Sequence, residues 1–170
     1  KLLTNDPWIL HTIETGLGWT FTSPPPLARG SDWLKAPHTN THLDQVQAKL
    51  LELIQQGAVE KVRDPQSPGF YSRFFVVPKK KPGEWRPILD LSVLNQHILC
   101  PTFKMDTAEK MRTLISPGAW ATSIDLVDAY LHMSVAPKFR NYLRFVVNHQ
   151  VYQYTVLPAG LSVAPWAWTR

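Results

Sequence analysis

A chain of 170 residues in which 44% of the side chains are apolar is long and apolar enough to bury one hydrophobic core. This composition excludes an intrinsically disordered segment. The net charge of +5 suits a polyanionic partner, and the single cysteine, Cys100, excludes an internal disulfide and a cysteine-based zinc site.

The sequence contains no apolar run that approaches the ~20 residues needed to span a bilayer, and it does not begin like a signal peptide. We therefore expect no membrane partner and an intracellular location, cytoplasmic or nuclear. The chain begins at Lys1, which is not a methionine, and ends at Arg170 inside an expected helix. We interpret it as a fragment.

Residues 1–40 carry scattered aromatic side chains and three consecutive prolines at positions 24–26, which favour an extended backbone. We expect an irregular leader. His38 and His42 are spaced for one face of a helix, but the neighbouring sequence offers no third ligand, which argues against a metal site.

Apolar residues recur at helical spacing over residues 43–54, which predicts an amphipathic helix. Thr41 is the expected N-terminal cap, and Gly57 supplies the stop. Residues 58–63 are then expected to form a strand.

Two β-rich runs, residues 73–77 and 85–91, flank the lysine-rich segment 78–84, in which Pro-Gly marks a turn. This pattern predicts a hairpin with a cationic tip. A solvated loop explains the lysines adequately. The functional interpretation is that the tip folds over a triphosphate, with Arg86 offering a planar fork for phosphate oxygens.

Residues 91–96 are expected to form a short helix. Asp106 or Thr107 can cap a further helix that runs to Ile115, and Pro-Gly at positions 117–118 ends it.

The next segment, residues 120–124, is typical of a short buried strand, which would leave Asp125 at its carboxyl end facing a cleft. Mg²⁺ prefers such oxygen ligands and is usually bound by one or two carboxylates together with substrate phosphates. The backbone of Asp128 and Ala129 would approach a triphosphate, and Tyr130 would lie beside a sugar. The alternative is that Asp125 only caps the following turn.

A second hairpin is predicted from residues 142–147 and 151–156, which flank a polar turn at 148–150. Arg144 and Gln153 would either meet nucleic acid or lie on an exposed edge.

Three of these segments together resemble reverse transcriptases. Residues 125–130 (Asp-Leu-Val-Asp-Ala-Tyr) resemble their first catalytic motif, residues 74–91 their fingers hairpin, and residues 157–165 the motif that opens the helix behind the nascent base pair. The three occur in the family's order. The sequences of residues 71–78 and 91–95 are most similar to those of DIRS-type retrotransposon polymerases.

The resemblance implies an α+β fold: the fingers and partial palm of a right-hand polymerase, made of antiparallel hairpins packed with helices and incomplete at the C-terminus. The implied divisions are a leader (1–40), fingers (41–98), the first part of the palm (99–133), the second part of the fingers (134–157) and the start of a truncated palm helix (158–170).

The resemblance also implies site residues. Asp125 would be the catalytic carboxylate and, with the backbone of Leu126, a metal ligand. Arg86 carries over directly as a triphosphate-binding residue. Among the tip lysines Lys79 fits this role best, and Lys80 is close behind.

Asp128 and Ala129 are implied to contact the triphosphate through their backbone, and Tyr130 to act as a steric gate against a ribose 2′-hydroxyl. Gly160 permits close approach of the backbone to the nucleotide. Ala159 departs from the family, which usually carries Gln or Phe there, and so removes a contact with the nucleotide.

The implied function is a fragment of an RNA-directed DNA polymerase of a retrotransposon. The complete parent would transfer nucleotides with two Mg²⁺ ions, Mn²⁺ being possible. Its partners would be an RNA template, a DNA primer, deoxynucleoside triphosphates and downstream palm, thumb and RNase H segments. Because the sequence contains no Tyr-x-Asp-Asp motif, we expect no polymerisation by this chain alone. The alternative is a truncated, inactive relic that retains only nucleic-acid binding.

Overall fold

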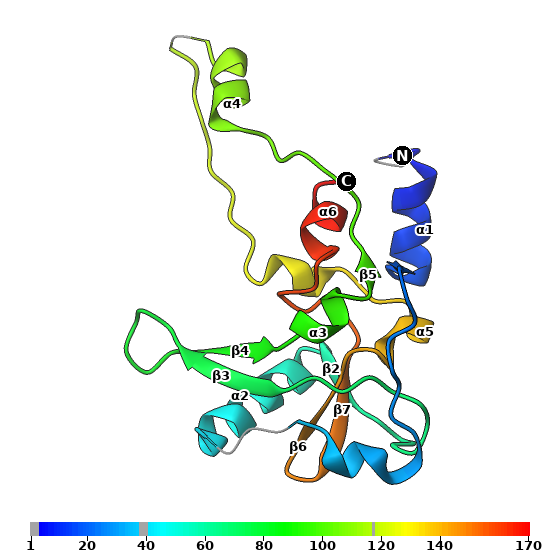
Figure 1. The fold of residues 1–170 in the computed structure, drawn as a ribbon. Coiled ribbons are helices and arrows are strands. Elements are labelled where there is room, and N and C mark those ends of the chain that lie inside the picture. Colours follow the sequence, from blue (N-terminus) through cyan, green and yellow to red (C-terminus); the bar gives the residue numbers. More distant parts are fainter. Residues whose placement is uncertain (1–3, 38–40, 117) are drawn as a thin grey trace.

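Three small antiparallel sheets organise the chain, which a computed structural model describes over residues 4–37, 41–116 and 118–170. Short helices surround the sheets, and one long arm projects from the body (Figure 1). The sheets have the strand orders β2-β7-β6, β3-β4 and β1-β5. Within these described ranges, none of the helices has the length and apolarity that a membrane crossing requires.

The predicted second hairpin is confirmed and supplies the central strand and one edge strand of the largest sheet. Strand β6 (Arg144–Val147) pairs with β7 (Gln150–Tyr154). Asn148 and His149 between them have φ of 49° and 57°, the left-handed conformation that two-residue hairpin turns need. Strand β2 (Val59–Lys61) then pairs with the other edge of β7.

The predicted amphipathic helix is also confirmed as α2 (Leu43–Gln55), which buries Val46, Leu50 and Leu53. It begins after His42, one residue later than the cap that we expected. Gly57 follows the helix with a φ of 72°, which lets the chain turn into β2 without a side-chain clash.

The predicted cationic hairpin is formed by β3 (Phe74–Pro78) and β4 (Trp85–Leu89). Phe74 is fully buried and stacks on Phe145 of β6 with 4.5 Å between ring centroids. This aromatic contact joins the hairpin to the largest sheet. The short helix α3 (Ser92–Asn95) follows β4, as predicted.

The expectation of an irregular leader is wrong for much of the N-terminal segment. Helix α1 (Pro7–Thr15) begins at Asp6, whose side chain accepts hydrogen bonds from the amides of Trp8 and Ile9. The Asp-Pro pair is a capping residue followed by proline at the first helical position, a signal that scattered aromatic residues obscured. Of the histidines considered for a metal site, His38 lies outside the described residues.

After α1 the chain crosses the molecule and joins its core. Strand β1 (Thr20–Phe21) pairs with β5 (Ile98–Leu99), and a 3-10 helix, η1 (Gly30–Lys35), follows. Leu17 and Trp19 are buried in the main core cluster.

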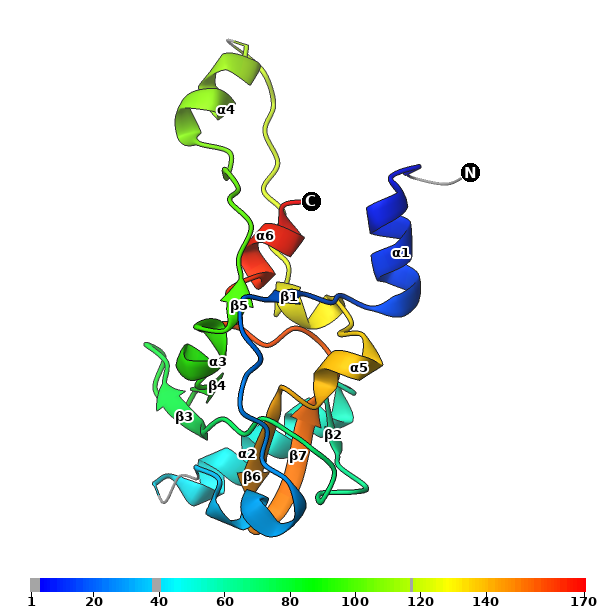
Figure 2. The same cartoon turned by 45° about the vertical axis from the view of Figure 1, so that its right-hand side comes forward.

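The arm that carries helix α4 (Ala108–Leu114) stands away from the body in both views (Figures 1 and 2). Thr107 caps the helix as predicted, accepting from the Lys110 amide at 3.3 Å. The buried strand expected next is wrong: Trp120 is 101% exposed, Ile124 is 83% exposed, and neither belongs to a strand. An apolar run becomes a buried strand only beside a pairing neighbour, and in the described parts of the chain none lies there.

The chain returns to the body through a 3-10 helix, η2 (Ala129–His132), and the short helix α5 (Pro137–Arg140). Between them, the amide of Val135 donates to Thr155 O at 2.8 Å, and the amide of Leu157 donates to Met133 O at 2.9 Å. These bonds fix the returning segment beside the extension of β7. Helix α6 (Ala164–Trp168) then ends the sequence of elements.

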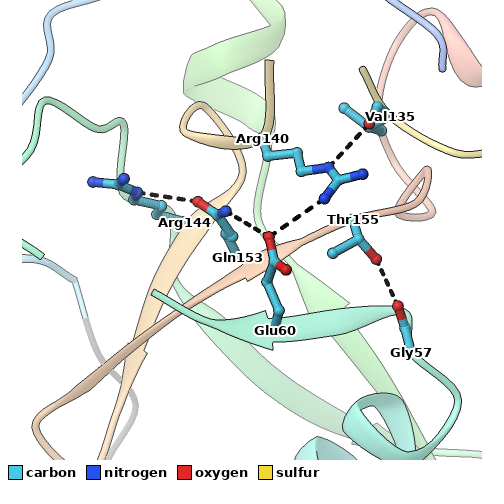
Figure 3. A network of polar contacts seen from close by, with 7 residues as sticks. All are labelled: Gly57, Glu60, Val135, Arg140, Arg144, Gln153 and Thr155. Carbon is cyan, nitrogen blue, oxygen red and sulfur yellow. Dashed lines mark hydrogen bonds and ion pairs between the residues drawn. The ribbon is translucent and has the colours of Figure 1, made fainter. Parts of the chain in front are cut away.

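A polar network crosses the largest sheet and contains Arg144, which is only 5% exposed (Figure 3). Arg144 Nε donates to Gln153 Oε1 at 3.3 Å, and Gln153 Nε2 donates to Glu60 Oε1 at 2.8 Å. The guanidinium also donates to the backbone and hydroxyl oxygens of Ser67 at 2.7 and 2.9 Å. Arg144 therefore holds a loop onto β6, and the interpretation that it meets nucleic acid is wrong.

Replacing this buried arginine should destabilise the fold. In Arg144→Leu the acceptors on Ser67 and Gln153 lose charged donors, so we expect the free energy of unfolding to fall by roughly 2–4 kcal/mol. Urea denaturation followed by circular dichroism measures the change. The matched control is Arg63→Leu, at an exposed position, which should stay close to wild type; equal effects of the two substitutions would contradict this role for Arg144.

Candidate nucleotide-binding pocket

A pocket of about 530 Å³ lies where the cationic hairpin, helix α2 and the returning segment meet. The hairpin contributes a basic wall and α2 a polar one, while η2 and α6 supply aromatic side chains. The residues that line the pocket include Lys49, Glu52, Lys79, Arg86, Asp128, Ala129, Tyr130, Tyr154, Ala159 and Trp168.

Five of the residues predicted to bind a nucleotide line this one pocket, although they come from segments far apart in sequence. They are Lys79, Arg86, Asp128, Ala129 and Tyr130. Lys79 and Arg86 belong to the hairpin at residues 74–91, the other three belong to residues 125–130, and the fold brings these two segments together.

The other predicted site residues lie outside the pocket lining. Lys80 is exposed on the hairpin tip, and Asp125 and Leu126 are exposed on the arm. Gly160 follows the lining residue Ala159 and has a φ of 97°, a conformation that favours glycine. The roles assigned to these four residues, like those of the five that line the pocket, stay predictions.

The basic wall contains Lys79, which has an ionic partner, and Arg86, which has none among the described residues. Lys79 and Lys81 both contact Glu84, at 3.7 and 2.8 Å, and the hydrogen bond from Lys81 holds the pKa of the Glu84 carboxyl below its usual value. Arg86 has no carboxylate partner among the described residues. Its guanidinium is therefore available to an external anion.

The pocket lining also includes an exposed acidic residue, Asp128, and a buried phenol, Tyr154. Asp128 has a φ of 49° and begins η2, a left-handed conformation that Asp tolerates better than most residues. Tyr154 is almost fully buried, and this burial, reinforced by the charge of Asp128, raises the pKa of its phenol strongly.

Asn95 fixes the loop that forms a further wall, a role that the sequence did not reveal. Its side-chain Nδ2 donates to Gly160 O at 2.8 Å, and its Oδ1 accepts from the amide of Ser162 at 2.9 Å. The nitrogen and the oxygen of one side-chain amide thus bind the backbone on either side of Leu161. This backbone follows directly after the pocket residue Ala159. The sequence gives no local signal for this contact, because the partners are more than sixty residues apart.

Sequence reasoning also missed Trp168 and the polar face of α2 as pocket residues. Lys49 and Glu52 line the pocket and pair with each other at 2.7 Å. Trp168 borders Tyr130, with 6.1 Å between ring centroids and the rings at 89°. Helical periodicity shows which face of a helix is polar, but it does not show what that face meets.

The two predicted metal ligands, Asp125 and Leu126, would form an incomplete set. In the described ranges no three His, Cys, Asp or Glu side chains gather closely enough to hold an ion. The carboxylate of Asp125 and the carbonyl of Leu126 are oxygen donors of the kind that suits one hard cation completed by substrate oxygens. They do not suffice for a two-ion centre.

Comparison with known proteins agrees with this architecture. The structure resembles that of a foamy viral protease-reverse transcriptase solved in complex with double-stranded DNA, with a TM-score of 0.68 and 19% identity, over 88% of this chain and 25% of that one. The fold is therefore the α+β fold of a polymerase's fingers and partial palm, as predicted.

The sequence matches the family described as reverse transcriptase (RNA-dependent DNA polymerase) over residues 77–170. This match covers more than half of the chain, which belongs to the reverse transcriptase family. Enzymes of this family use divalent metal ions.

Individual relatives include transposon and retroviral polyproteins. The chain is 23% identical over 141 residues to the retrovirus-related Pol polyprotein from transposon 412 of Drosophila melanogaster, and 30% identical over 146 residues to the Pol polyprotein of equine infectious anemia virus, strain Wyoming. These alignments cover 80% and 79% of this chain but only 11% and 12% of the relatives. The expected family is confirmed, and the expected domain boundaries stay a prediction.

Tyr154 should make the protein sensitive to alkali. A phenol whose pKa is raised on folding contributes stability below its unfolded pKa of about 10, and this contribution is lost as pH rises through the folded pKa. We expect wild type to lose more stability than Tyr154→Phe between about pH 9 and pH 11. Urea denaturation across this range measures the difference; parallel profiles would show that the burial of Tyr154 has no such effect.

Asn95 should control the order of the loop at residues 160–162. In Asn95→Ala both hydrogen bonds are lost, so we expect stability to fall by about 1–2 kcal/mol and the Ser162 amide to exchange faster with solvent. Hydrogen exchange followed by NMR measures this. Gln96→Ala, at the exposed neighbouring position, is the control. If the Ser162 amide of Asn95→Ala exchanged as slowly as in wild type, the role of Asn95 in ordering the loop would be refuted.

Proposed function

We propose that the pocket binds the incoming deoxynucleoside triphosphate of an RNA-directed DNA polymerase, and that the parent is a DIRS-type retrotransposon. The observation that carries this proposal is the convergence of Lys79, Arg86 and residues 128–130 on one pocket. The volume of about 530 Å³ lies within the range of small-molecule sites. The DIRS assignment is supported by the amino-acid sequence of residues 71–78 and 91–95 alone.

The chemistry of the basic wall suits a triphosphate. The guanidinium of Arg86, which has no carboxylate partner in the part of the chain that the structure describes, can donate two parallel hydrogen bonds to phosphate oxygens. Lys79 is more weakly engaged than Lys81, because its distance to Glu84 is 3.7 Å rather than 2.8 Å. It can therefore turn toward an anion without breaking a short ion pair. Lys80, at the exposed tip, would follow if the tip closed over the ligand.

The opposite side of the pocket suits the sugar. Tyr130 would lie against the deoxyribose and leave no room for a 2′-hydroxyl, while the backbone of Asp128 and Ala129 would donate to phosphate. Gly160 would allow the backbone to approach the nucleotide. Ala159 offers only a methyl group here, so the aromatic residues provide most of the contact surface on this side.

Asp125 and the carbonyl of Leu126 are the proposed ligands of a divalent ion, Mg²⁺ or Mn²⁺. When bound, such an ion would neutralise charge on the triphosphate. Asp125 would be the catalytic carboxylate in the parent, where a second motif would complete the centre.

The partners in the parent would be an RNA template, a DNA primer, and downstream palm, thumb and RNase H segments. The chain spans about an eighth of the length of the polyproteins that it matches, so most of the parent would lie outside it. The net charge of +5 suits a nucleic-acid partner. The foamy viral relative was solved with double-stranded DNA, which supports the same class of partner for this chain.

Arg86 provides the sharpest test of the pocket. We expect Arg86→Gln to weaken binding of dATP about tenfold or more, because a charge-assisted bidentate contact is lost. Lys79→Gln should weaken dATP binding less than Arg86→Gln does. Comparing Lys79→Gln with Lys80→Gln shows which of the two tip lysines contributes more to binding. Ligand-observed NMR, which detects millimolar affinities, measures binding, and Arg63→Gln is the matched control.

Equal dATP binding by Arg86→Gln and Arg63→Gln would refute the triphosphate site. Under the alternative of an inactive relic, the chain would bind an RNA–DNA hybrid in a salt-sensitive way and would show no specific affinity for dATP.

A further inference from the structure

We propose that Trp168 is a positioning residue which holds the ring of Tyr130 and thereby sets how strongly the pocket prefers deoxyribose to ribose. This inference rests on the proposed function, because it assigns the sugar selectivity of the same pocket to a second aromatic residue. Nothing in the sequence pattern pointed to Trp168.

The first observation is the contact between the two rings. The ring centroids of Tyr130 and Trp168 are 6.1 Å apart and the planes are nearly perpendicular, at 89°. This edge-to-face arrangement is a preferred geometry for aromatic pairs. Among the described residues, Trp168 is the one whose ring contacts the ring of Tyr130, and both residues line the pocket.

The second observation is that Trp168 borders two cavities. Besides the nucleotide pocket, it lines a largely apolar cavity of about 330 Å³ next to helix α1, where Ile9, Ile13 and Met133 are its neighbours. Tyr130 does not line this second cavity. The indole thus lies between Tyr130 and open space, and removing it would leave a void beside Tyr130 and no ring to support it on that side.

The third observation is that the nearby loop provides little substitute support. Ala159 lines the same pocket but carries only a methyl group. Helix α6 places Trp168 at the pocket while it buries Ala164 and Ala167 against the core. The helix is therefore anchored on one face and presents the indole from its last turn.

Helix α1 anchors α6 further through aromatic and ionic contacts. Trp8 meets Trp166 edge-to-face with 5.3 Å between centroids, and the guanidinium of Arg170 lies 5.3 Å from the Trp8 ring. Arg170 also pairs with Asp6 at 3.6 Å. The residues on both sides of Trp168 are thus attached to α1.

Exclusion of a single hydroxyl group depends on how firmly the excluding ring is held. A ring that can tilt by a small amount makes room for the 2′-oxygen, whereas a ring locked by a packed neighbour does not. Trp168 should therefore affect the ratio of the two nucleotide affinities more than the affinity for the deoxynucleotide itself.

The test compares the binding of dATP and ATP to the 170-residue chain by ligand-observed NMR in magnesium-containing buffer. We expect Trp168→Ala to reduce the preference for dATP over ATP about fivefold or more, mainly by strengthening the binding of ATP. Trp168→Phe keeps a ring edge against Tyr130 and should retain most of the preference. Trp33→Ala, on η1 and outside the pocket lining, is the matched control.

Circular dichroism establishes that each variant is folded. If Trp168→Ala does not fold, Trp168→Leu fills more of the space without offering a flat ring, and a reduced preference in that variant supports the proposal. An unchanged ratio in the folded Ala or Leu variant overturns it.

The experiment also separates this inference from the function on which it rests. Wild type that binds dATP through Arg86, with an unchanged ratio in the Trp168 variants, would leave the triphosphate site standing and refute the role of Trp168. Equal binding of dATP and ATP by wild type would refute the gate and the inference together. Absence of any dATP binding would refute the proposed function and, with it, the inference.

Discussion

The pairing of β2 with β7 is the constraint on which the pocket depends. It places Val59 opposite Tyr154, so that the end of helix α2 and the end of the second hairpin lie side by side. The extension of β7 then binds the returning segment through the amides of Val135 and Leu157. Because η2 immediately precedes this segment, one non-local strand pairing aligns the polar face of α2 with Asp128 and Tyr130.

The two halves of the proposed catalytic centre differ in how firmly the fold holds them. The phosphate side is built on β3, β4 and α2, which share the main core through Phe74, Leu89 and Leu50. The metal side lies on the exposed arm, where Asp125 sits between the exposed residues Ile124 and Leu126. Positioning of reacting groups to a fraction of an ångström requires locked rotamers. The fold therefore holds the proposed anion site more firmly than it holds the proposed metal ligands.

The sequence predicted the elements whose causes are local and missed those whose causes are distant. Turn residues fix both hairpins, and apolar spacing fixes α2, so these needed no tertiary information. The strand expected at residues 120–124 has the right composition but lacks a neighbour, because pairing is a property of two segments. The burial of Arg144 was missed for the same reason, since its acceptors on Ser67 lie far away in sequence. The family motifs located individual pocket residues, but no motif contains Asn95 together with the loop that it holds.

Helix α1 lies outside the stretch that matches the family, residues 77–170, yet it is attached to the end of that stretch. Asp6 and Trp8 both contact Arg170, and Trp8 packs against Trp166. A short helix such as α6 is only marginally stable by itself, because it contains few internal hydrogen bonds. Its orientation must therefore come from tertiary contacts, and part of them come from α1. The N-terminal segment thus supports α6 and, through it, the aromatic side chain of Trp168 in the pocket lining.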